Sequence, residues 1–189
     1  MRRFIVVSNT ASTEPFSLKD LPGSAGRMDV VVRCLNTAFF LSNDLRRDVE
    51  VLAVLLGPPD PPVTLRVVGA ELKYMNPDER NIASLINHAL MKGASEAERR
   101  STPGIYISRR GFEDALSEEF ILLDEDGEPW HGAPEVQTFL LGDQKGLNAE
   151  QMEYARERAR RTVSLGPKHY HTDHCILITN YLLDRETLL

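Results

Sequence analysis

The sequence predicts an α/β fold: a single domain over residues 1–189, with a mainly parallel sheet flanked by helices. Short apolar runs rich in β-branched residues alternate with longer amphipathic segments over most of the chain, as in β–α–β units. In addition, 42% of the residues are hydrophobic, which suits one sizeable core in a chain of 189 residues. These observations exclude a disordered protein.

The first half of the chain contains three predicted strands and two predicted helices. Apolar positions recur at helical spacing between residues 27 and 41, which predicts an amphipathic helix. Asn76 as the N-cap, Pro77 at the first helical position and Glu79 three residues after the cap predict a second helix. Apolar runs predict strands at residues 4–7, 49–56 and 63–68.

The second half alternates in the same way. Helices are predicted at residues 112–118, at 148–161 with Asn148 as the N-cap, and at 175–183. Apolar runs predict further strands at residues 104–108, 120–123, 136–141 and 162–165. Because helices separate most of these strands, we expect most neighbours in the sheet to be parallel.

Three loops follow predicted strands in the second half, at residues 124–127, 142–147 and 166–172. Open α/β sheets bind ligands beyond the carboxyl ends of their strands, so these loops are the candidate binding site. None of them is a Walker loop or a GxGxxG turn. A P-loop nucleotidase and a standard dinucleotide-dependent enzyme are therefore disfavoured.

Composition narrows the class of protein further. The two cysteines, Cys34 and Cys175, exclude a disulfide-stapled module and an all-cysteine zinc module, and favour a cytoplasmic protein. No segment has the length of a signal peptide's apolar core or of a membrane span, so no membrane association is expected. The net charge of −6 argues against RNA, but residues 113–128 hold eight acidic residues and no Lys or Arg. The rest of the chain carries +2, which permits an RNA partner.

A histidine-rich string near the end has the letters of a metal motif, H-x-H-x-D-H, as in the metallo-β-lactamase superfamily. Its ligands would be His169, His171, Asp173 and His174, and the protein would be a zinc-dependent hydrolase. Only fifteen residues follow, and none is a histidine that could complete such a site. We therefore expect no metal, and interpret the string as a helix entry capped by Thr172 or Asp173.

Several strings, in order along nearly the whole chain, resemble one family. They are Leu21–Asp29, Arg33–Ser42, Arg46–Val49, Gly69–Leu72, Asn76–Asn81, Ser101–Ile105, Arg110–Phe112, Leu141–Asp143, Ser164–Pro167 and His174–Cys175. Together they resemble the archaeal tRNA pseudouridine-54 N1-methyltransferases, the TrmY family of the SPOUT class of knotted methyltransferases. The chain departs from the family's common pattern at Asn43, Gln144 and Gly166.

The resemblance implies a homodimer with a C-terminal trefoil knot at approximately residues 120–189. It also implies S-adenosylmethionine as the cofactor and tRNA as the substrate, with methyl transfer to N1 of pseudouridine 54 in the T-loop. Two alternatives stay open, a pseudouridine methyltransferase of the same class that acts on rRNA, and an RNA-binding protein without catalysis. Carried over by position, the residues that bind the cofactor would be Leu123, Leu141, Gly142, Ser164, Leu165, Gly166, Pro167, Tyr170 and Cys175.

Methyl transfer from a sulfonium to a ring nitrogen needs alignment and the loss of the N1 proton. Asp29, with Arg27 beside it, is the catalytic candidate, because a carboxylate can assist at the base or accept that proton. The alternative is that both residues only charge the first turn of their helix. Cys175 could act as a covalent nucleophile, but N1 alkylation needs no such adduct, which favours packing against the cofactor.

Candidate contacts to RNA are arginines that flank loops near strand ends, since their planar guanidinium suits phosphate. The lone Trp130 could stack on a base or anchor its loop to the body of the protein. The arginines are Arg46, Arg47, Arg109 and Arg110.

Overall fold

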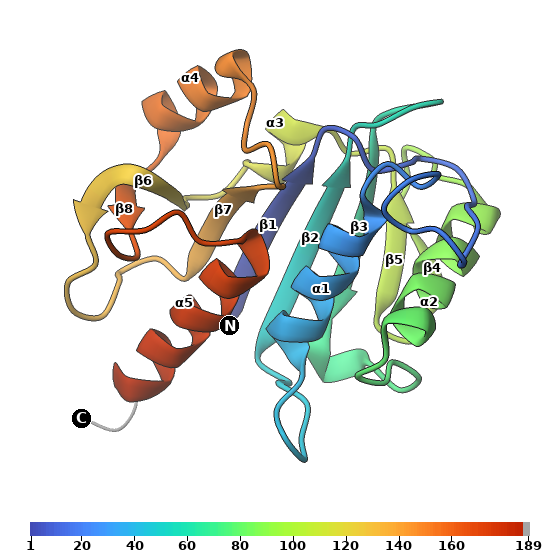
Figure 1. The fold of residues 1–189 in the computed structure, drawn as a ribbon, viewed down its shortest axis with the longest axis horizontal. Coiled ribbons are helices and arrows are strands. Elements are labelled where there is room, and N and C mark those ends of the chain that lie inside the picture. Colours follow the sequence, from blue (N-terminus) through green and yellow to red (C-terminus); the bar gives the residue numbers. More distant parts are fainter. Residues whose placement is uncertain (187–189) are drawn as a thin grey trace.

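The computed structural model describes residues 1–186 and contains one eight-stranded sheet, ordered β4-β5-β3-β2-β1-β7-β6-β8 (Figure 1). The strands are β1 Arg2–Ser8, β2 Val49–Leu55, β3 Val63–Val68, β4 Arg99–Thr102, β5 Ile105–Ser108, β6 Ile121–Pro129, β7 Thr138–Gly142 and β8 Arg161–Ser164. The helices are α1 Met28–Phe39, α2 Glu79–Lys92, α3 Phe112–Ala115, α4 Ala149–Arg158 and α5 Thr172–Glu186, with a short 3₁₀ turn at Gly69–Glu71.

The sheet is mixed, so the prediction of a mainly parallel sheet is wrong for one half of it. β1 is parallel to β2 and β7, and β6 is parallel to β7 and β8. β3, however, is antiparallel to β2 and β5, and β4 is antiparallel to β5. The chain between β2 and β3 covers only residues 56–62, which is too short for the crossover that a parallel neighbour needs.

Strand β4 is absent from the sequence-based prediction. It reads Arg99-Arg100-Ser101-Thr102, without the apolar alternation that marks a half-buried strand. It lies at the edge of the sheet and pairs with β5 through a two-residue connection. Polar and basic residues are common on such edges, because they discourage pairing with other chains.

The start of α2 differs from its prediction. The N-cap is Asp78, whose carboxylate accepts a hydrogen bond from Asn81 N at 2.8 Å. Asn76 was expected there, but its own N–H donates to the Asn81 side chain at 2.8 Å, so it lies outside the helix. Pro77 lies before the helix with it, and the helix begins at Glu79.

The caps of the last two helices give one confirmed and one wrong prediction. Asn148 caps α4, accepting from Gln151 N at 2.9 Å while the Gln151 side chain bonds back to Asn148 N. That helix ends at Arg158, because Arg161 already belongs to β8. Helix α5 begins at Thr172, and the Thr172 hydroxyl donates to the carbonyl of Gly142 at 2.8 Å, so it does not serve as the expected cap.

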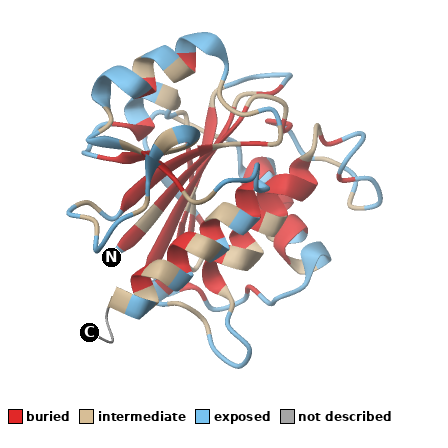
Figure 2. Cartoon of the chain, turned by 60° about the vertical axis from the view of Figure 1, so that its left-hand side comes forward, coloured by how far each residue is buried: buried red, intermediate tan, exposed pale blue. Residues whose placement is uncertain are grey.

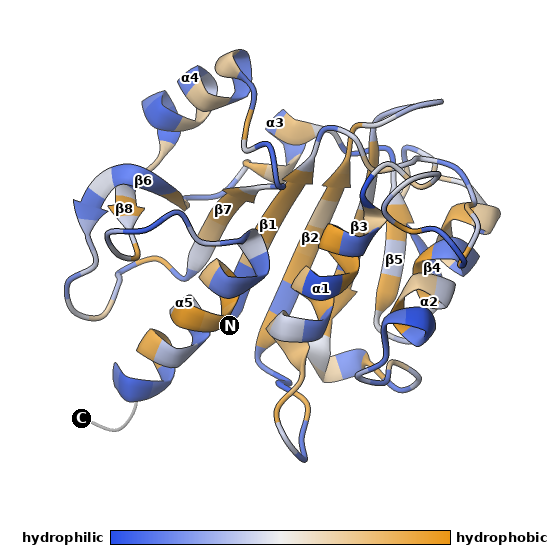
Figure 3. Ribbon diagram, viewed as in Figure 1, coloured by the Kyte–Doolittle hydropathy of each residue, from blue (hydrophilic) through white to orange (hydrophobic). Residues whose placement is uncertain are grey.

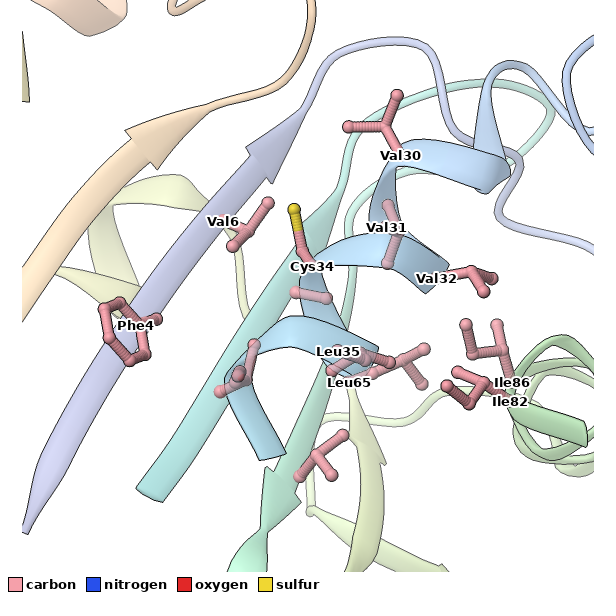
Figure 4. Close-up of a cluster of buried hydrophobic side chains, with 14 of the residues drawn as sticks. Phe4, Val6, Val30, Val31, Val32, Cys34, Leu35, Leu65, Ile82 and Ile86 are labelled. Carbon is pink, nitrogen blue, oxygen red and sulfur yellow. The ribbon is translucent and has the colours of Figure 1, made fainter. Parts of the chain in front are cut away.

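Helices cover both faces of the sheet. α1, α2 and α5 pack on one face, and α3 and α4 pack on the other, α3 against β2 (Figures 1 and 2). Figure 4 shows that Cys34 of α1 points toward Val6 of β1 and Leu35 lies beside Leu65 of β3, whereas Val32 points toward Ile82 and Ile86 of α2. Each fully buried aliphatic side chain of this kind stabilises the fold by about 1.5–3 kcal/mol.

Strand β2 is buried at all seven positions, which agrees with its nearly all-apolar sequence. The exception, Glu50, is paired with Arg3 at 2.7 Å and with Arg66 at 3.1 Å. Figure 3 shows the same contrast across the molecule: the central strands are hydrophobic, whereas α4 is largely hydrophilic. Within residues 1–186, no helix is long and apolar enough to cross a membrane.

Candidate functional site

A cavity of ≈ 530 Å³ opens at the carboxyl ends of β6, β7 and β8. Two of the three segments that the sequence singles out form it as loops, at residues 142–147 and 166–172. The loop predicted at residues 124–127 is wrong, because these residues lie within β6, where its pairing with β8 shifts register between Leu123 and Glu128. Asp124 and Glu125 line the cavity from this irregular part of the strand. Eight of the nine expected cofactor residues line it: Leu123, Leu141, Gly142, Ser164, Leu165, Gly166, Tyr170 and Cys175. Pro167 lies in the same loop but does not line the cavity.

The floor of the cavity is a tight turn after β7. A Cβ on Gly142 would lie 2.6 Å from Gly146 Cα and from Leu147 N, so only glycine permits this close approach. Gly146 N donates to Asp143 O at 2.9 Å, and Gly146 has a φ of 75°, a conformation that glycine adopts without strain. These two glycines therefore fix the path of residues 143–146 against the end of the sheet.

Asp143 holds this turn and is a residue that the sequence analysis missed. Its side chain is buried, and its carboxylate accepts from Ser8 Oγ at 2.8 Å, from Asn9 N at 3.1 Å and from Lys145 N at 2.9 Å. The carboxylate thus joins the turn to the end of β1. Its place directly after Gly142, at the end of an apolar strand, is the sequence signal that could have identified it.

The third loop is closed by local contacts and by one contact to the second loop. Gly166 has a φ of 152°, and a Cβ there would lie 3.1 Å from Tyr170 Oη, so glycine lets Tyr170 fold over the loop. Ser164 Oγ donates to Gly166 O at 3.1 Å. The bond from Thr172 Oγ1 to Gly142 O then joins the loop to the turn after β7.

Arg27 and Asp29 lie at the start of α1, beyond the end of β1, and do not line the cavity. Arg27 is the one non-glycine residue with positive φ in residues 1–186, at φ 68° and ψ 34°. Its guanidinium donates to both carboxylate oxygens of Asp29 at 2.9 and 3.1 Å, and Arg33 donates to Asp29 at 2.8 Å. Arg33 also reaches Asp173 of α5 at 4.0 Å, which links the cluster to the loop that enters α5.

The ionisation of Asp29 follows from these contacts. Burial raises its pKa, but the hydrogen bonds and positive charges of Arg27 and Arg33 outweigh burial and leave the pKa below its usual value. Asp29 is therefore ionised at neutral pH and is a weak base.

Comparison with known proteins places this geometry in a family. The chain matches the family described as "Putative SAM-dependent RNA methyltransferase" over residues 1–188. The tRNA (pseudouridine(54)-N(1))-methyltransferase of Methanocella arvoryzae is 48% identical over 191 residues, which cover 98% of this chain and 100% of the relative. The protein of the same name from Methanocaldococcus jannaschii is 42% identical over 202 residues, covering 100% of this chain and 98% of the relative.

The chain belongs to this family of tRNA methyltransferases. Its fold is also that of Archaeoglobus fulgidus Nep1, solved bound to S-adenosylhomocysteine, with a TM-score of 0.70, 16% identity and 100% coverage of both chains. At that identity the likeness concerns the fold alone.

The cofactor of the methyltransferase is S-adenosylmethionine, and the cavity fits it. A volume of ≈ 530 Å³ lies within the range of about 300–1,000 Å³ that small-molecule sites occupy. The side chain of Asp124, about 10% exposed, lines the cavity together with Asp143, and carboxylates suit a ligand that carries a positive sulfonium. Gly142 and Gly166 leave space that a Cβ would fill. That the individual residues bind the cofactor stays a prediction.

Cys175 of the methyltransferase lines the cavity from the first turn of α5. Burial, together with the charge of nearby Asp173, raises the pKa of its thiol to about 11. The thiol is therefore protonated at neutral pH, which favours packing over nucleophilic attack.

The four arginines expected to contact RNA do not form one surface. Arg46 is paired with Asp184 at 2.6 and 3.0 Å, and Arg47 donates to two backbone carbonyls, both near the amino end of β2. Arg109 and Arg110 follow the carboxyl end of β5, which lies at the opposite end of the strands from the amino end of β2. There Arg109 is paired with Asp60 of the β2–β3 loop. Their contact with RNA stays a prediction, and three of the four guanidinium groups already have protein partners.

Trp130 of the methyltransferase anchors its loop. Its indole stacks on Phe139 with ring centres 5.8 Å apart, and the backbone N–H of Trp130 donates to Ser164 O at 3.0 Å. Of the two interpretations of this residue, the structure favours the anchor over stacking on a base.

The histidine-rich string forms no metal centre within the described residues 1–186, where no group of three or more candidate ligands occurs. His169 is paired with Glu125 at 2.9 Å, and the rings of His171 and His174 meet edge to face at 5.3 Å. The string is the end of the third cavity loop and the first turn of α5. The zinc hydrolase therefore has no ligand set in this part of the chain.

Proposed function

We propose that the protein transfers a methyl group from S-adenosylmethionine to N1 of pseudouridine 54 in the T-loop of tRNA. The tRNA substrate is inferred from one observation: the chain is 42–48% identical, over nearly its whole length, to relatives named tRNA (pseudouridine(54)-N(1))-methyltransferase. The cavity supports the cofactor half of the reaction, since two loops and part of β6 converge on it at the end of the sheet where α/β folds bind ligands.

S-adenosylmethionine supplies a methyl group already activated on a sulfonium, so the protein needs to bind and align rather than to form a covalent intermediate. The glycine turn at Gly142 and the loop at Gly166 hold the cofactor, while Leu123 and Leu141 exclude water from it. The remaining task falls to the residues that hold the acceptor base and take up its proton.

Arg27 and Asp29 act at the acceptor base in this proposal. Arg33 ties this pair to the helix that borders the cavity, since it donates to Asp29 at 2.8 Å and lies 4.0 Å from Asp173 in the first turn of α5. Asp29 holds the Arg27 guanidinium through two hydrogen bonds. Its lowered pKa favours this positioning role over uptake of the N1 proton, which then passes to water.

The protein also forms a homodimer in this proposal, with a second copy covering α5. Leu177 and Tyr181 lie one turn apart on α5 and are 56% and 57% exposed, whereas Ile176 and Asn180 on the other side are buried. We expect Leu177→Glu with Tyr181→Glu to give a monomer by sedimentation velocity, with far-UV circular dichroism unchanged. A dimer that persists would contradict this interface.

The family resemblance further supports a trefoil knot within residues 120–189 and a cytoplasmic enzyme. The path of the chain supports the knot: from β8 at the edge of the sheet it returns past the end of β7 to α5, which packs beside α1. The two free thiols, Cys34 and Cys175, support a reducing compartment.

The decisive experiment is nucleoside mass spectrometry of tRNA transcripts incubated with enzyme and cofactor. We expect N1-methylpseudouridine only in transcripts that carry pseudouridine at position 54. A matched transcript with uridine there is the control, because uridine has no free N1. Methylation of an rRNA fragment but not of tRNA would favour the alternative substrate, and methylation of neither would refute the proposal.

A further inference from the structure

Two lysines lie at the mouth of the cofactor cavity, on two different loops. Lys145 is in the turn after β7, and Lys168 is in the loop between β8 and α5. Both side chains are exposed and both line the cavity. They are two of only five lysines in the chain.

The backbone that carries Lys145 is held in place. Lys145 N donates to the buried carboxylate of Asp143 at 2.9 Å, and Gly146 N closes the turn on Asp143 O at the same distance. Gly142 packs against the far side of the turn. The stem of Lys145 therefore starts from a fixed point, and only its own rotamers are free.

Neither ammonium group is neutralised by a carboxylate within residues 1–186, even though carboxylates are near. The acidic residues that line the cavity have other partners: Asp143 accepts three hydrogen bonds, Asp124 lies 3.5 Å from Arg156, and Glu125 is paired with His169. Two positive charges are thus left beside the opening, where they meet whatever enters it.

We propose that Lys145 and Lys168 bind the backbone phosphates of the target nucleotide in the substrate RNA. This inference rests on the proposed function. A base whose N1 points to the methyl group lies inside the cavity, so its sugar and the phosphates on either side stay at the rim. Lysine suits this task, because an ammonium on a flexible stem binds phosphate as a point charge without reading sequence.

The test measures RNA binding, cofactor binding and turnover separately. Lys145→Ala, Lys168→Ala and the double variant are compared with the parent and with Lys73→Ala. Lys73 is a matched control, since it is also exposed and follows the antiparallel strand β3, whose carboxyl end lies at the end of the sheet away from the cavity. The probe is a fluorescent T-arm stem-loop with pseudouridine at position 54, titrated by anisotropy at several salt concentrations. Calorimetry gives the affinity for S-adenosylmethionine.

Each rim variant is expected to weaken RNA binding about 3- to 10-fold and to raise KM for RNA with kcat nearly unchanged. The slope of log Kd against log salt should fall by about 0.7–0.9 for each lysine removed. Arginine at either position should restore most of the affinity, because it keeps the charge. Binding of S-adenosylmethionine should not change.

Two results would overturn the inference: RNA affinity and salt slope equal to those of Lys73→Ala, or a loss of cofactor affinity instead, which would assign the lysines to the cofactor's carboxylate. Failure of the proposed function is distinguishable. A parent protein that binds the stem-loop through these lysines but methylates no pseudouridine would keep the inference and refute the function, and one that binds no RNA would refute both.

Discussion

Replacing Asp143 with alanine tests the buried contact on which the cavity floor depends. The substitution leaves three donors without their acceptor: Ser8 Oγ, Asn9 N and Lys145 N. Water can reach Lys145, which is exposed, so the cost comes mainly from Ser8 and Asn9. Ser8 is buried and Asn9 is half-buried, and a buried donor left unpaired costs about 1–3 kcal/mol. Loss of the carboxylate's own desolvation penalty offsets part of this, and we expect a net destabilisation of about 2–4 kcal/mol.

The measurement is urea denaturation followed by circular dichroism, with calorimetry of S-adenosylmethionine binding on the same samples. Affinity for the cofactor should fall at least about tenfold, because a loosened turn no longer holds its backbone in place. Asp20→Ala is the matched control: Asp20 also accepts two backbone N–H bonds, at 3.0 and 2.9 Å, but in an exposed loop. Its cost should stay below about 1 kcal/mol. If Asp143→Ala matched this control in both assays, the role assigned to Asp143 would be wrong.

Three further predictions concern the site. Since its folded pKa lies below the unfolded value, Asp29 contributes stability above about pH 4 that is lost as the pH falls through the folded pKa. Asp29→Asn should therefore flatten the acid limb of stability, while the shape of kcat/KM between about pH 6 and 9 stays the same. Gly142→Ala should weaken cofactor binding at least about tenfold in calorimetry, because its Cβ meets the backbone of Gly146. Gly111→Ala, where a Cβ has 3.7 Å of clearance, should leave binding unchanged. Cys175, with a thiol pKa of about 11, should react slowly with iodoacetamide at neutral pH, and Cys175→Ala should still methylate RNA.

Each of these has a clear contrary result. A new ionisation near neutral pH in the rate profile that Asp29→Asn abolishes would make Asp29 the proton acceptor. Full cofactor affinity in Gly142→Ala would mean that the turn can move away. Complete loss of methylation in Cys175→Ala, with RNA and cofactor binding intact, would restore the covalent mechanism.

The candidate site was predictable in part because its signals are local. A loop that follows an apolar strand is visible in sequence, and so are the glycines at Gly142, against the backbone of Gly146, and at Gly166, against the side chain of Tyr170. Asp143 was missed because its importance lies in Ser8 and Asn9, more than 130 positions away. No pattern in the neighbouring sequence reports such a contact.

The predicted RNA arginines illustrate the same limit. Arg46 was chosen because it flanks a strand, yet its guanidinium is paired with Asp184, 138 positions later. The helix start at Asn76 failed for a more local reason, since Asp78 competes for the cap and Asn81 holds Asn76 outside the helix. A propensity for capping does not decide between two candidates two residues apart.

The sequence by itself determined the alternation of strands and helices, the family and two of the loops that meet at the cavity, because apolar periodicity and turn residues act over a few positions. Only the tertiary structure decided the direction of β3, β4 and β5, the burial of Asp143 and the partners of the arginines. Strand pairing and charge neutralisation join segments that are distant along the chain, so they depend on the whole fold rather than on any local pattern. Lys145 and Lys168 therefore became notable only once the fold had brought their loops to one rim and left both ammonium groups without a carboxylate in the described part of the chain.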